Sequence, residues 1–284
     1  MPSYILLADC RDRAGISAAV TSFLAEAGGF ILDSQQHGDA ETGRFFLRIA
    51  FAAAEGAVIE MDSLRVKFAN VADRFSMRWT ITNVGERPRT LLAVSRFGHC
   101  LNHLLHRWQT GTLPVDVVGV VSNHEDMRAL TEWHGIPYHY LPVTRDTKDD
   151  QEIAFSNVID DYDAELLVLA RYMQVLSKQF AAQLLGRCIN IHHSFLPSFK
   201  GAKPYHQAHA RGVKIIGATA HYVTDDLDEG PIIEQDVERI THDQSAAQFV
   251  ELGQDIEARV LARAVRWHAE KRVVLNGAKT VVFR

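Results

Sequence analysis

The chain has few cysteines and no long hydrophobic run. Its 284 residues include only three cysteines, Cys10, Cys100 and Cys188, which lie far apart and form no C-x-x-C pair. Neither a disulfide framework nor a cysteine-based zinc or redox motif is indicated. No stretch approaches the roughly 18 apolar residues of a membrane-spanning helix, and the N-terminus lacks the basic and apolar segments of a secretory signal. We therefore expect a cytoplasmic protein with no membrane partner.

An excess of basic charge is also missing. Thirty Lys and Arg residues face 35 Asp and Glu residues, which gives a formal net charge of −5. No broad basic field is available to hold a polyphosphate, so nucleic acid is not an expected partner. Hydrophobic residues make up 47% of the chain, which is enough for a sizeable buried core and excludes disorder. The length predicts about two domains.

The first 84 residues predict a small α+β domain. Short apolar or alternating runs predict strands at 4–8, 30–36, 44–51 and 76–82. Apolar residues at three- and four-residue spacing predict helices at 16–27 and 55–68. The resulting order is βαββαβ. A polar segment with both Gly and Pro, at 85–89, is typical of a linker.

Strands and helices alternate from residue 90 onward. Near-continuous apolar runs such as 164–170 are typical of a parallel sheet that helices cover on both faces. Ser245 and Gln248 match a capping box that begins a long helix through about His268, and Asn276 followed by Gly277 predicts a hairpin. The predicted fold class is α/β: a βαββαβ domain at 1–84, a linker at 85–89, and a Rossmann-like domain with a mostly parallel sheet at 90–284.

The predicted strand 188–192 and the loop 224–231 carry the candidate chemistry. Side chains alternate along a strand, so Asn190 and His192 share one face at its C-terminal end, where open parallel sheets bind ligands. An amide N–H aimed at a carbonyl oxygen stabilises a tetrahedral oxyanion. A carboxylate such as Asp228 orients an imidazole and favours its charged form. No serine or cysteine nucleophile is evident, so the pattern favours direct attack of water or a bound nucleophile on a small acyl group.

These segments resemble the signatures of a known family. Asn190-Ile-His192, Ser194-Phe-Leu-Pro197 and 221–231 are similar to motifs of the formyltransferase fold that uses 10-formyltetrahydrofolate, and 1–84 resembles an ACT domain. That fusion is typical of the formyltetrahydrofolate deformylase family. The resemblance implies hydrolysis of 10-formyltetrahydrofolate to formate and tetrahydrofolate, which balances one-carbon pools and supplies formate for purine synthesis. It implies Asn190, His192 and Asp228 as catalytic residues. It also implies that the folate is the substrate and that neither a cofactor nor a metal is needed.

The resemblance also implies where the substrate and an effector bind. Substrate-binding residues are expected in 170–177 and 224–228, namely Arg171, Met173, Val175, Leu176, Thr224 and Asp225. The ACT resemblance implies a homo-oligomer. It also implies a candidate amino-acid effector at the turn of Asp12, Gly15 and Ile16, where free backbone N–H groups could hold a carboxylate. The sequence does not decide the effector, the oligomer size, the order of proton transfers, the glutamate-tail preference or the roles of Lys200 and Lys203.

Several alternatives stay open beside this interpretation. A formyltransferase acting on a small amine is the nearest, but glycinamide-ribonucleotide transformylases carry Gly-Asn-Gly-Ser-Asn after the first strand, and 95–102 keeps only Gly98 of those glycines. The segment therefore lacks most of the glycines whose backbone N–H groups would bind a ribose phosphate. An inactive folate- or amino-acid-binding regulator would have little use for the full trio, and a nicotinamide dehydrogenase would need G-x-G-x-x-G.

Some single residues outside the catalytic trio allow other interpretations. His206 and His209, together with His192 or His221, could form a metal site. Cys188 could act as a nucleophile paired with histidine, although a small core residue is the expected role. His193 is expected to face away from His192 and to support it or to pack.

Overall fold

The computed structural model describes residues 3–195 and 204–284 and divides into two compact units. Unit 1 contains Met1–Arg87, Glu270–Val274 and Val281–Arg284, and unit 2 contains Pro88–Ala269 and Leu275–Thr280. The residues after Ala269 thus divide between the units, whereas the sequence assigns all of 90–284 to the second domain. In the described part of the chain, no helix is both long and apolar enough to cross a membrane.

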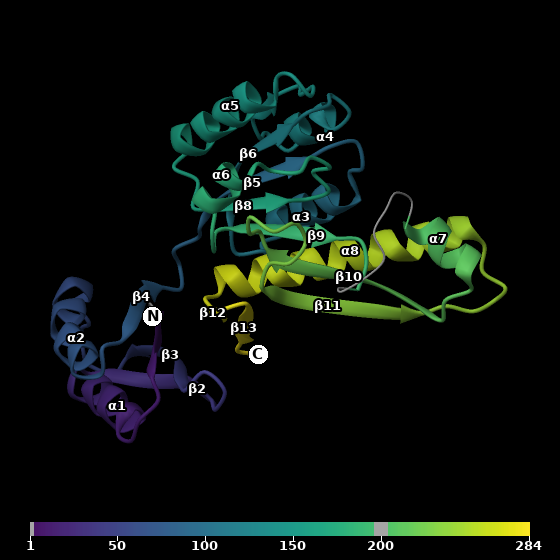
Figure 1. Ribbon diagram of the computed structural model, residues 1–284. Helices are drawn as coiled ribbons and strands as arrows, with labels where there is room; N and C mark the ends of the chain where they lie inside the picture. The colour runs from purple at the N-terminus through teal and green to yellow at the C-terminus, as the bar shows by residue number, and fades with distance from the viewer. Residues whose placement is uncertain (1–2, 196–203) are drawn as a thin grey trace. The chain divides into compact units, whose positions relative to one another are not determined.

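Unit 1 has the predicted βαββαβ order (Figure 1). Its elements are β1 (Ser3–Arg11), α1 (Ile16–Glu26), β2 (Gly29–Asp39), β3 (Arg44–Ala53), α2 (Met61–Phe75) and β4 (Arg78–Asn83). The sheet is antiparallel, with strand order β2-β3-β1-β4. Buried side chains of β1 and β3 share one hydrophobic core with those of α1 and α2. This ACT-like α+β unit confirms the predicted fold of the first part of the chain.

The second helix of unit 1 begins later than predicted. The sequence predicts a helix at 55–68, but α2 spans Met61–Phe75. Gly56 has a positive φ of 76° within a turn that the Ala57 N–H closes onto the carbonyl of Ala54, so the chain cannot be helical there. Ser76, with φ 50°, ends the helix in the left-handed region.

Unit 2 is built on a seven-stranded sheet. Its strands are β5 (Arg89–Val94), β6 (Asp116–Ser122), β7 (Tyr138–Tyr140), β8 (Leu166–Leu169), β9 (Cys188–His192), β10 (Ile215–Tyr222) and β11 (Ile232–Arg239). The sheet order is β11-β10-β9-β8-β5-β6-β7. Strands β9, β8, β5, β6 and β7, which are consecutive in the sheet, run parallel, and β10 is antiparallel to both of its neighbours. The predicted mostly parallel sheet is confirmed.

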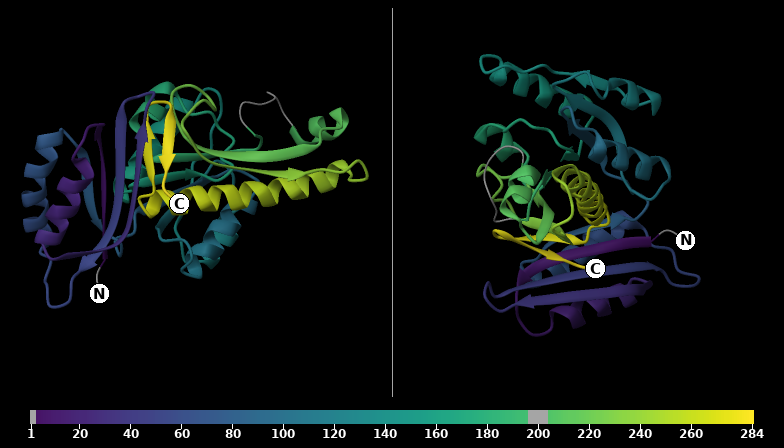
Figure 2. Two further views of the ribbon diagram at one scale, coloured as in Figure 1. Left: turned by 90° about the horizontal axis from the view of Figure 1, so that it is seen from below. Right: turned by 90° about the vertical axis from the view of Figure 1, so that its right-hand side faces the viewer.

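Helices cover this sheet. They are α3 (His99–Gln109), α4 (Arg128–Trp133), α5 (Lys148–Asp161), α6 (Lys178–Gln183), α7 (Pro204–Arg211) and α8 (Ala246–Ala269). Buried side chains of α5 and α6 share one core with side chains of β5, β8 and β9. The long helix α8 packs on α3 and runs alongside β10 and β11 (Figures 1 and 2). Helix α7 had no counterpart among the predicted elements.

Two local predictions are confirmed at the end of the chain. Ser245 and Gln248 form the capping box: the Ser245 N–H donates to Gln248 Oε1 (2.8 Å), and the Gln248 N–H donates to Ser245 Oγ (3.3 Å). β12 (Val273–Asn276) and β13 (Lys279–Val282) pair in a two-stranded sheet, with Gly277 at φ 63° in the turn between them.

Candidate active site

A cavity lies where the parallel part of the sheet in unit 2 meets its antiparallel edge. It has a volume of about 210 Å³ and is formed by the segment after β8, the end of β9, the end of β10 and the loop that follows β10. Open parallel sheets place ligands at this end of their strands. The lining includes all nine residues that the sequence assigned to catalysis and to substrate: Asn190, His192, Asp228, Arg171, Met173, Val175, Leu176, Thr224 and Asp225.

The three candidate catalytic side chains converge in this cavity. Asn190 and His192 come from β9 and lie two residues apart on one face, and Asp228 comes from the loop after β10. His192 Nδ1 lies 3.2 Å from Asp228 Oδ2, which is hydrogen-bond distance. The His192 side chain is 13% exposed and the Asp228 side chain 27% exposed, so both are largely shielded while remaining open to a ligand.

His221 completes the group and was not among the predicted catalytic residues. It lies opposite Asn190 in the β9–β10 pairing, and its ring is buried. Its Nδ1 is 2.9 Å from the carbonyl of Tyr222, and because a carbonyl only accepts, Nδ1 carries the proton. Nε2 lies 3.2 Å from Asn190 Nδ2 and 3.7 Å from Asp228 Oδ1. Nε2 therefore accepts a hydrogen bond from Asn190, which leaves the second amide N–H of Asn190 available.

The loop that carries Asp228 is shaped by a glycine. A side chain at Gly230 would overlap the carbonyl oxygen of Tyr222, so only glycine fits where the loop folds back on β10. The Tyr222 N–H then donates to the carbonyl of Pro231 (2.9 Å). Asp228 itself has a positive φ of 59°, a strained conformation for a residue with a side chain and one that clusters at functional sites. The β10–β11 pairing also shifts register next to His221, as bulges beside active sites do.

Asp228 is held in its ionised form. Burial by itself raises the pKa of Asp228, but the hydrogen bond from His192 and the nearby His221 outweigh burial and hold that pKa well below its ordinary value. A carboxylate at neutral pH accepts hydrogen bonds only. It therefore fixes the orientation of His192, with Nδ1 toward Asp228.

The remaining predicted substrate residues differ in character. Met173, Val175 and the neighbouring Leu227 are large apolar side chains that are more than half exposed at the cavity. Exposed apolar groups around a cavity are typical of a ligand-binding rim. Arg171 is instead turned inward, with its side chain 11% exposed.

Arg171 lines the cavity and also belongs to a buried cluster of charged and polar side chains. Its Nη1 lies 2.9 Å from His193 Nδ1, and its Nε lies 3.3 Å from Glu257 Oε2. Glu257, on α8, is 1% exposed and also accepts hydrogen bonds from His99 (2.8 Å) and from the Tyr205 hydroxyl (2.6 Å). Burial raises the pKa of Glu257, but the His99 hydrogen bond and the Arg171 charge more than offset it, so the net pKa is lowered.

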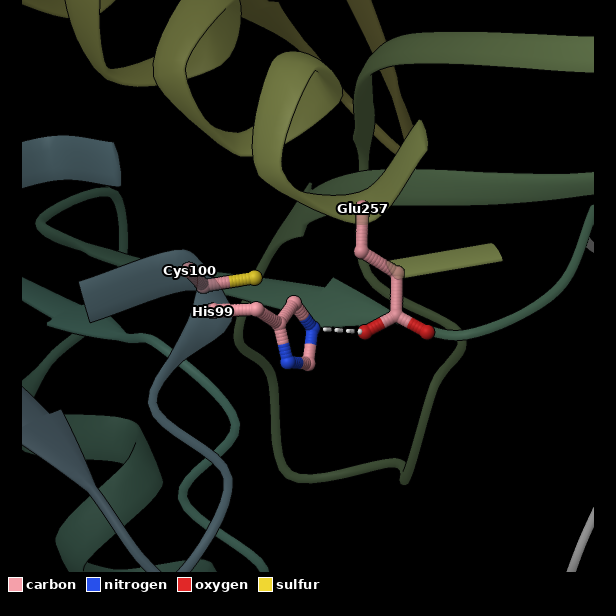
Figure 3. Close-up of side chains that lie close together, drawn as sticks. All are labelled: His99, Cys100 and Glu257. Carbon is pink, nitrogen blue, oxygen red and sulfur yellow. Dashed lines mark hydrogen bonds and ion pairs between the residues drawn. The ribbon is translucent and has the colours of Figure 1, made fainter. Parts of the chain in front are cut away.

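Within the described residues, one group has the spacing of metal ligands. Figure 3 shows His99 and Glu257 joined by their hydrogen bond, with the Cys100 thiol beside them. Burial and the nearby Glu257 raise the pKa of the Cys100 thiol well above its ordinary value, so the thiol stays protonated. Arg171 already compensates the charge of Glu257. These contacts favour an ion-pair network over a metal centre.

The other candidate residues lie apart from the cavity or engage other groups. Cys188 is fully buried, and burial raises the pKa of its thiol, so it lacks the thiolate character of a nucleophile. His206 and His209 are exposed on α7. His193 stacks on His192, with ring centroids 4.7 Å apart, rather than facing away from it, because β9 ends at His192 and the alternation ends there too. Lys200, Lys203 and Pro197 lie outside the described residues.

Two glycines considered in the sequence analysis, Gly98 and Gly15, each precede a helix. A side chain at Gly98 would overlap the sulfur of Met127, so in this protein Gly98 allows close packing of the segment before α3. In unit 1, Gly15 precedes α1 with φ 93° in open space, and Asp12 is exposed. Ile16 is buried against Cys10 and Phe75, so only its backbone is available to an effector.

Comparison with known proteins agrees with this geometry. The formyl transferase family model matches residues 88–265. The formyltetrahydrofolate deformylase of Corynebacterium sp. (strain P-1) is 50% identical over 281 residues, which is 99% of this chain and 98% of that protein. The crystal structure of formyltetrahydrofolate deformylase from Burkholderia mallei superimposes with a TM-score of 0.96 at 50% identity, and the match covers the whole of both chains.

A transformylase structure matches only part of the chain. The phosphoribosylglycinamide formyltransferase of Coxiella burnetii superimposes with a TM-score of 0.64 at 29% identity, over 69% of this chain and 94% of that one. The deformylases thus match both units, whereas this transformylase covers about two thirds of the chain. The chain therefore belongs to the formyl transferase family and, within it, to the formyltetrahydrofolate deformylases.

Proposed function

We propose that this protein hydrolyses 10-formyltetrahydrofolate to formate and tetrahydrofolate, with Asn190, His192 and Asp228 as its catalytic residues. The observation that carries the proposal is the convergence of an amide, an imidazole and an ionised carboxylate on one cavity. Its volume of about 210 Å³ corresponds to several water molecules at about 30 Å³ each. A one-carbon acyl group and one water therefore fit together.

Asp228 and His192 activate the water. Asp228 is ionised and holds His192 through Nδ1, which turns Nε2 toward the reacting groups. As the water oxygen bonds to the formyl carbon, the Asp228–His192 pair takes up its proton. Asn190 has one amide N–H beyond its bond to His221, and this donor stabilises the oxyanion of the tetrahedral intermediate.

Collapse of the intermediate completes the reaction. The bond between the formyl carbon and N10 breaks, and protonated His192 delivers its proton to N10. The products are tetrahydrofolate and formic acid, which ionises to formate, so the atoms of substrate and water are all accounted for. Neither an amine acceptor nor a covalent enzyme intermediate takes part.

The folate ring system would lie along the rim of the cavity. Met173 and Val175 from the segment after β8 and Leu227 from the loop after β10 present exposed apolar surface, and burial of such surface stabilises binding by about 25 cal/mol per Å². Leu176, Thr224 and Asp225 line the same cavity. We propose them as pterin contacts, and unit 1 as a regulatory ACT-like module that binds an amino acid or assembles copies of the chain.

Formate release decides between hydrolysis and formyl transfer. Purified protein is incubated with 10-formyltetrahydrofolate alone, and formate and tetrahydrofolate are quantified over time. Equal amounts of both products without any added amine are expected. A requirement for an amine acceptor, with the formyl group recovered on that amine, would replace hydrolysis by formyl transfer.

A further inference from the structure

Arg171, His193 and Glu257 form a buried arrangement that the proposed hydrolysis does not yet use. Arg171 has a positive φ of 66°. Hydrogen bonds to Ser95 hold the backbone at and after Arg171. The Ser95 N–H donates to the Arg171 carbonyl (3.2 Å), and the Met173 N–H donates to Ser95 Oγ (3.0 Å). A strained conformation that neighbouring bonds enforce is a feature of functional sites.

The position of the proton on His193 follows from its partner. A guanidinium only donates hydrogen bonds, and Arg171 Nη1 lies 2.9 Å from His193 Nδ1, so Nδ1 is an acceptor without a proton. Neutral His193 therefore carries its proton on Nε2. His193 lines the cavity, and no described side chain or backbone group pairs with Nε2.

The surroundings of His193 keep it uncharged. Burial, the Arg171 guanidinium and His192 lower the pKa of His193 to about 4, against smaller opposing effects of Glu257 and Asp228. The ring also stacks on His192 at 4.7 Å with an interplanar angle of 22°. His193 therefore does not exchange protons near neutral pH, unlike its neighbour in the proposed mechanism.

We infer that His193 donates a hydrogen bond from Nε2–H to the attacking water, and that the buried Arg171–Glu257 pair fixes His193 in this tautomer. Glu257 forms an ion pair with the Arg171 guanidinium, and the same guanidinium donates a hydrogen bond to His193 Nδ1. A fixed donor beside His192 holds the water oxygen at the formyl carbon without competing for its proton. This inference rests on the proposed hydrolysis and adds Arg171 and Glu257 as positioning residues.

Two substitutions of His193 separate its donor from its bulk. His193→Phe keeps a flat ring against His192 but has no N–H, and we expect kcat to fall about 100-fold, with KM within about threefold, because a misplaced reactant costs about that much. His193→Gln restores an N–H near the Nε2 position and should recover about tenfold of the loss. A kcat within about threefold of wild type for His193→Phe, or an equal loss in both variants, would overturn the donor role.

The tautomer itself is observable by ¹⁵N NMR of histidine-labelled protein, with the His193 signals assigned by their absence from His193→Gln. We expect the neutral Nε2–H form throughout about pH 5.5 to 8.5. Removal of Arg171 alone would leave Glu257 buried without its counter-charge, which is strongly destabilising, so the neutral pair Arg171→Met with Glu257→Gln is used. In that double variant no guanidinium faces Nδ1, so the Nδ1–H tautomer should become populated beside Nε2–H, and kcat should fall.

A matched control exists elsewhere in the chain. Arg107 Nε donates to His103 Nε2 (2.8 Å) on α3, outside the cavity, so Arg107→Met removes an Arg–His bond without touching the site and should leave kcat and its pH profile unchanged. A wild-type His193 that carries its proton on Nδ1, or that titrates above about pH 5.5, would refute the inference even if hydrolysis is established. Absence of formate release by the wild type would instead refute the proposed function.

Discussion

Asp228→Asn is the substitution that tests the catalytic assignment most directly. The asparagine has nearly the same shape, but it carries no charge and presents an N–H donor to His192. At 3.2 Å and an effective dielectric constant of about 20, the attraction between a carboxylate and an imidazolium is about 5 kcal/mol. Because the Asp228 side chain is 27% exposed, solvent screens part of this attraction, and about 3 to 4 kcal/mol is left.

That free energy corresponds to a fall in kcat of about 10²- to 10³-fold. Formate release at saturating 10-formyltetrahydrofolate, measured near neutral pH, gives the number. Glu229→Gln is the matched control, because Glu229 is the adjacent exposed carboxylate and does not line the cavity; its kcat should match the wild type. A kcat for Asp228→Asn within tenfold of the wild type would show that Asp228 does not act on His192 in the rate-limiting step.

The same substitution has a signed effect on stability. The pKa of Asp228 is lowered in the folded protein, so its contribution to stability is fully present above the unfolded pKa of about 3.9 and is lost as the pH falls through the folded value. The melting temperature of Asp228→Asn should therefore lie below that of the wild type at pH 7, and the gap should narrow in acid. A gap that widens in acid would contradict the lowered pKa.

Three further predictions follow from buried geometry. Gly230→Ala should abolish most formate release and lower the melting temperature, because the new methyl group overlaps the Tyr222 carbonyl and displaces the Asp228 loop; wild-type values for both would contradict this. A thiol reagent should modify no cysteine in the native protein and three after denaturation, since all three are buried. For His193, with a folded pKa of about 4 against about 6.5 unfolded, the unfolded chain takes up the proton first as pH falls, so about 3 kcal/mol of stability is lost between pH 8 and 4. Urea unfolding of His193→Gln should show a correspondingly smaller loss.

Local sequence rules predicted the parts of the site that depend on one strand or one turn. Asn190 and His192 share a face because side chains alternate along β9. The Gly230-Pro231 pair indicated a tight loop, and that loop brings Asp228 to His192. His221 was visible at the start of the same motif, but its pairing with Asn190 depends on the antiparallel register of β9 and β10, which no local pattern encodes.

The sequence by itself determined the order of the described strands and helices except α7, and the α+β and parallel α/β architectures, because strand alternation, helix periodicity and turn residues act over a few positions. The resemblance of its motifs to a known family supplied Asn190, His192 and Asp228 as candidates. Tertiary structure alone decided that Arg171 points inward to Glu257, which is 86 residues further along the chain, and that His193 stacks on His192. Both outcomes depend on how separate helices and strands pack and on which charges become buried together, and these are energies of contacts between distant residues.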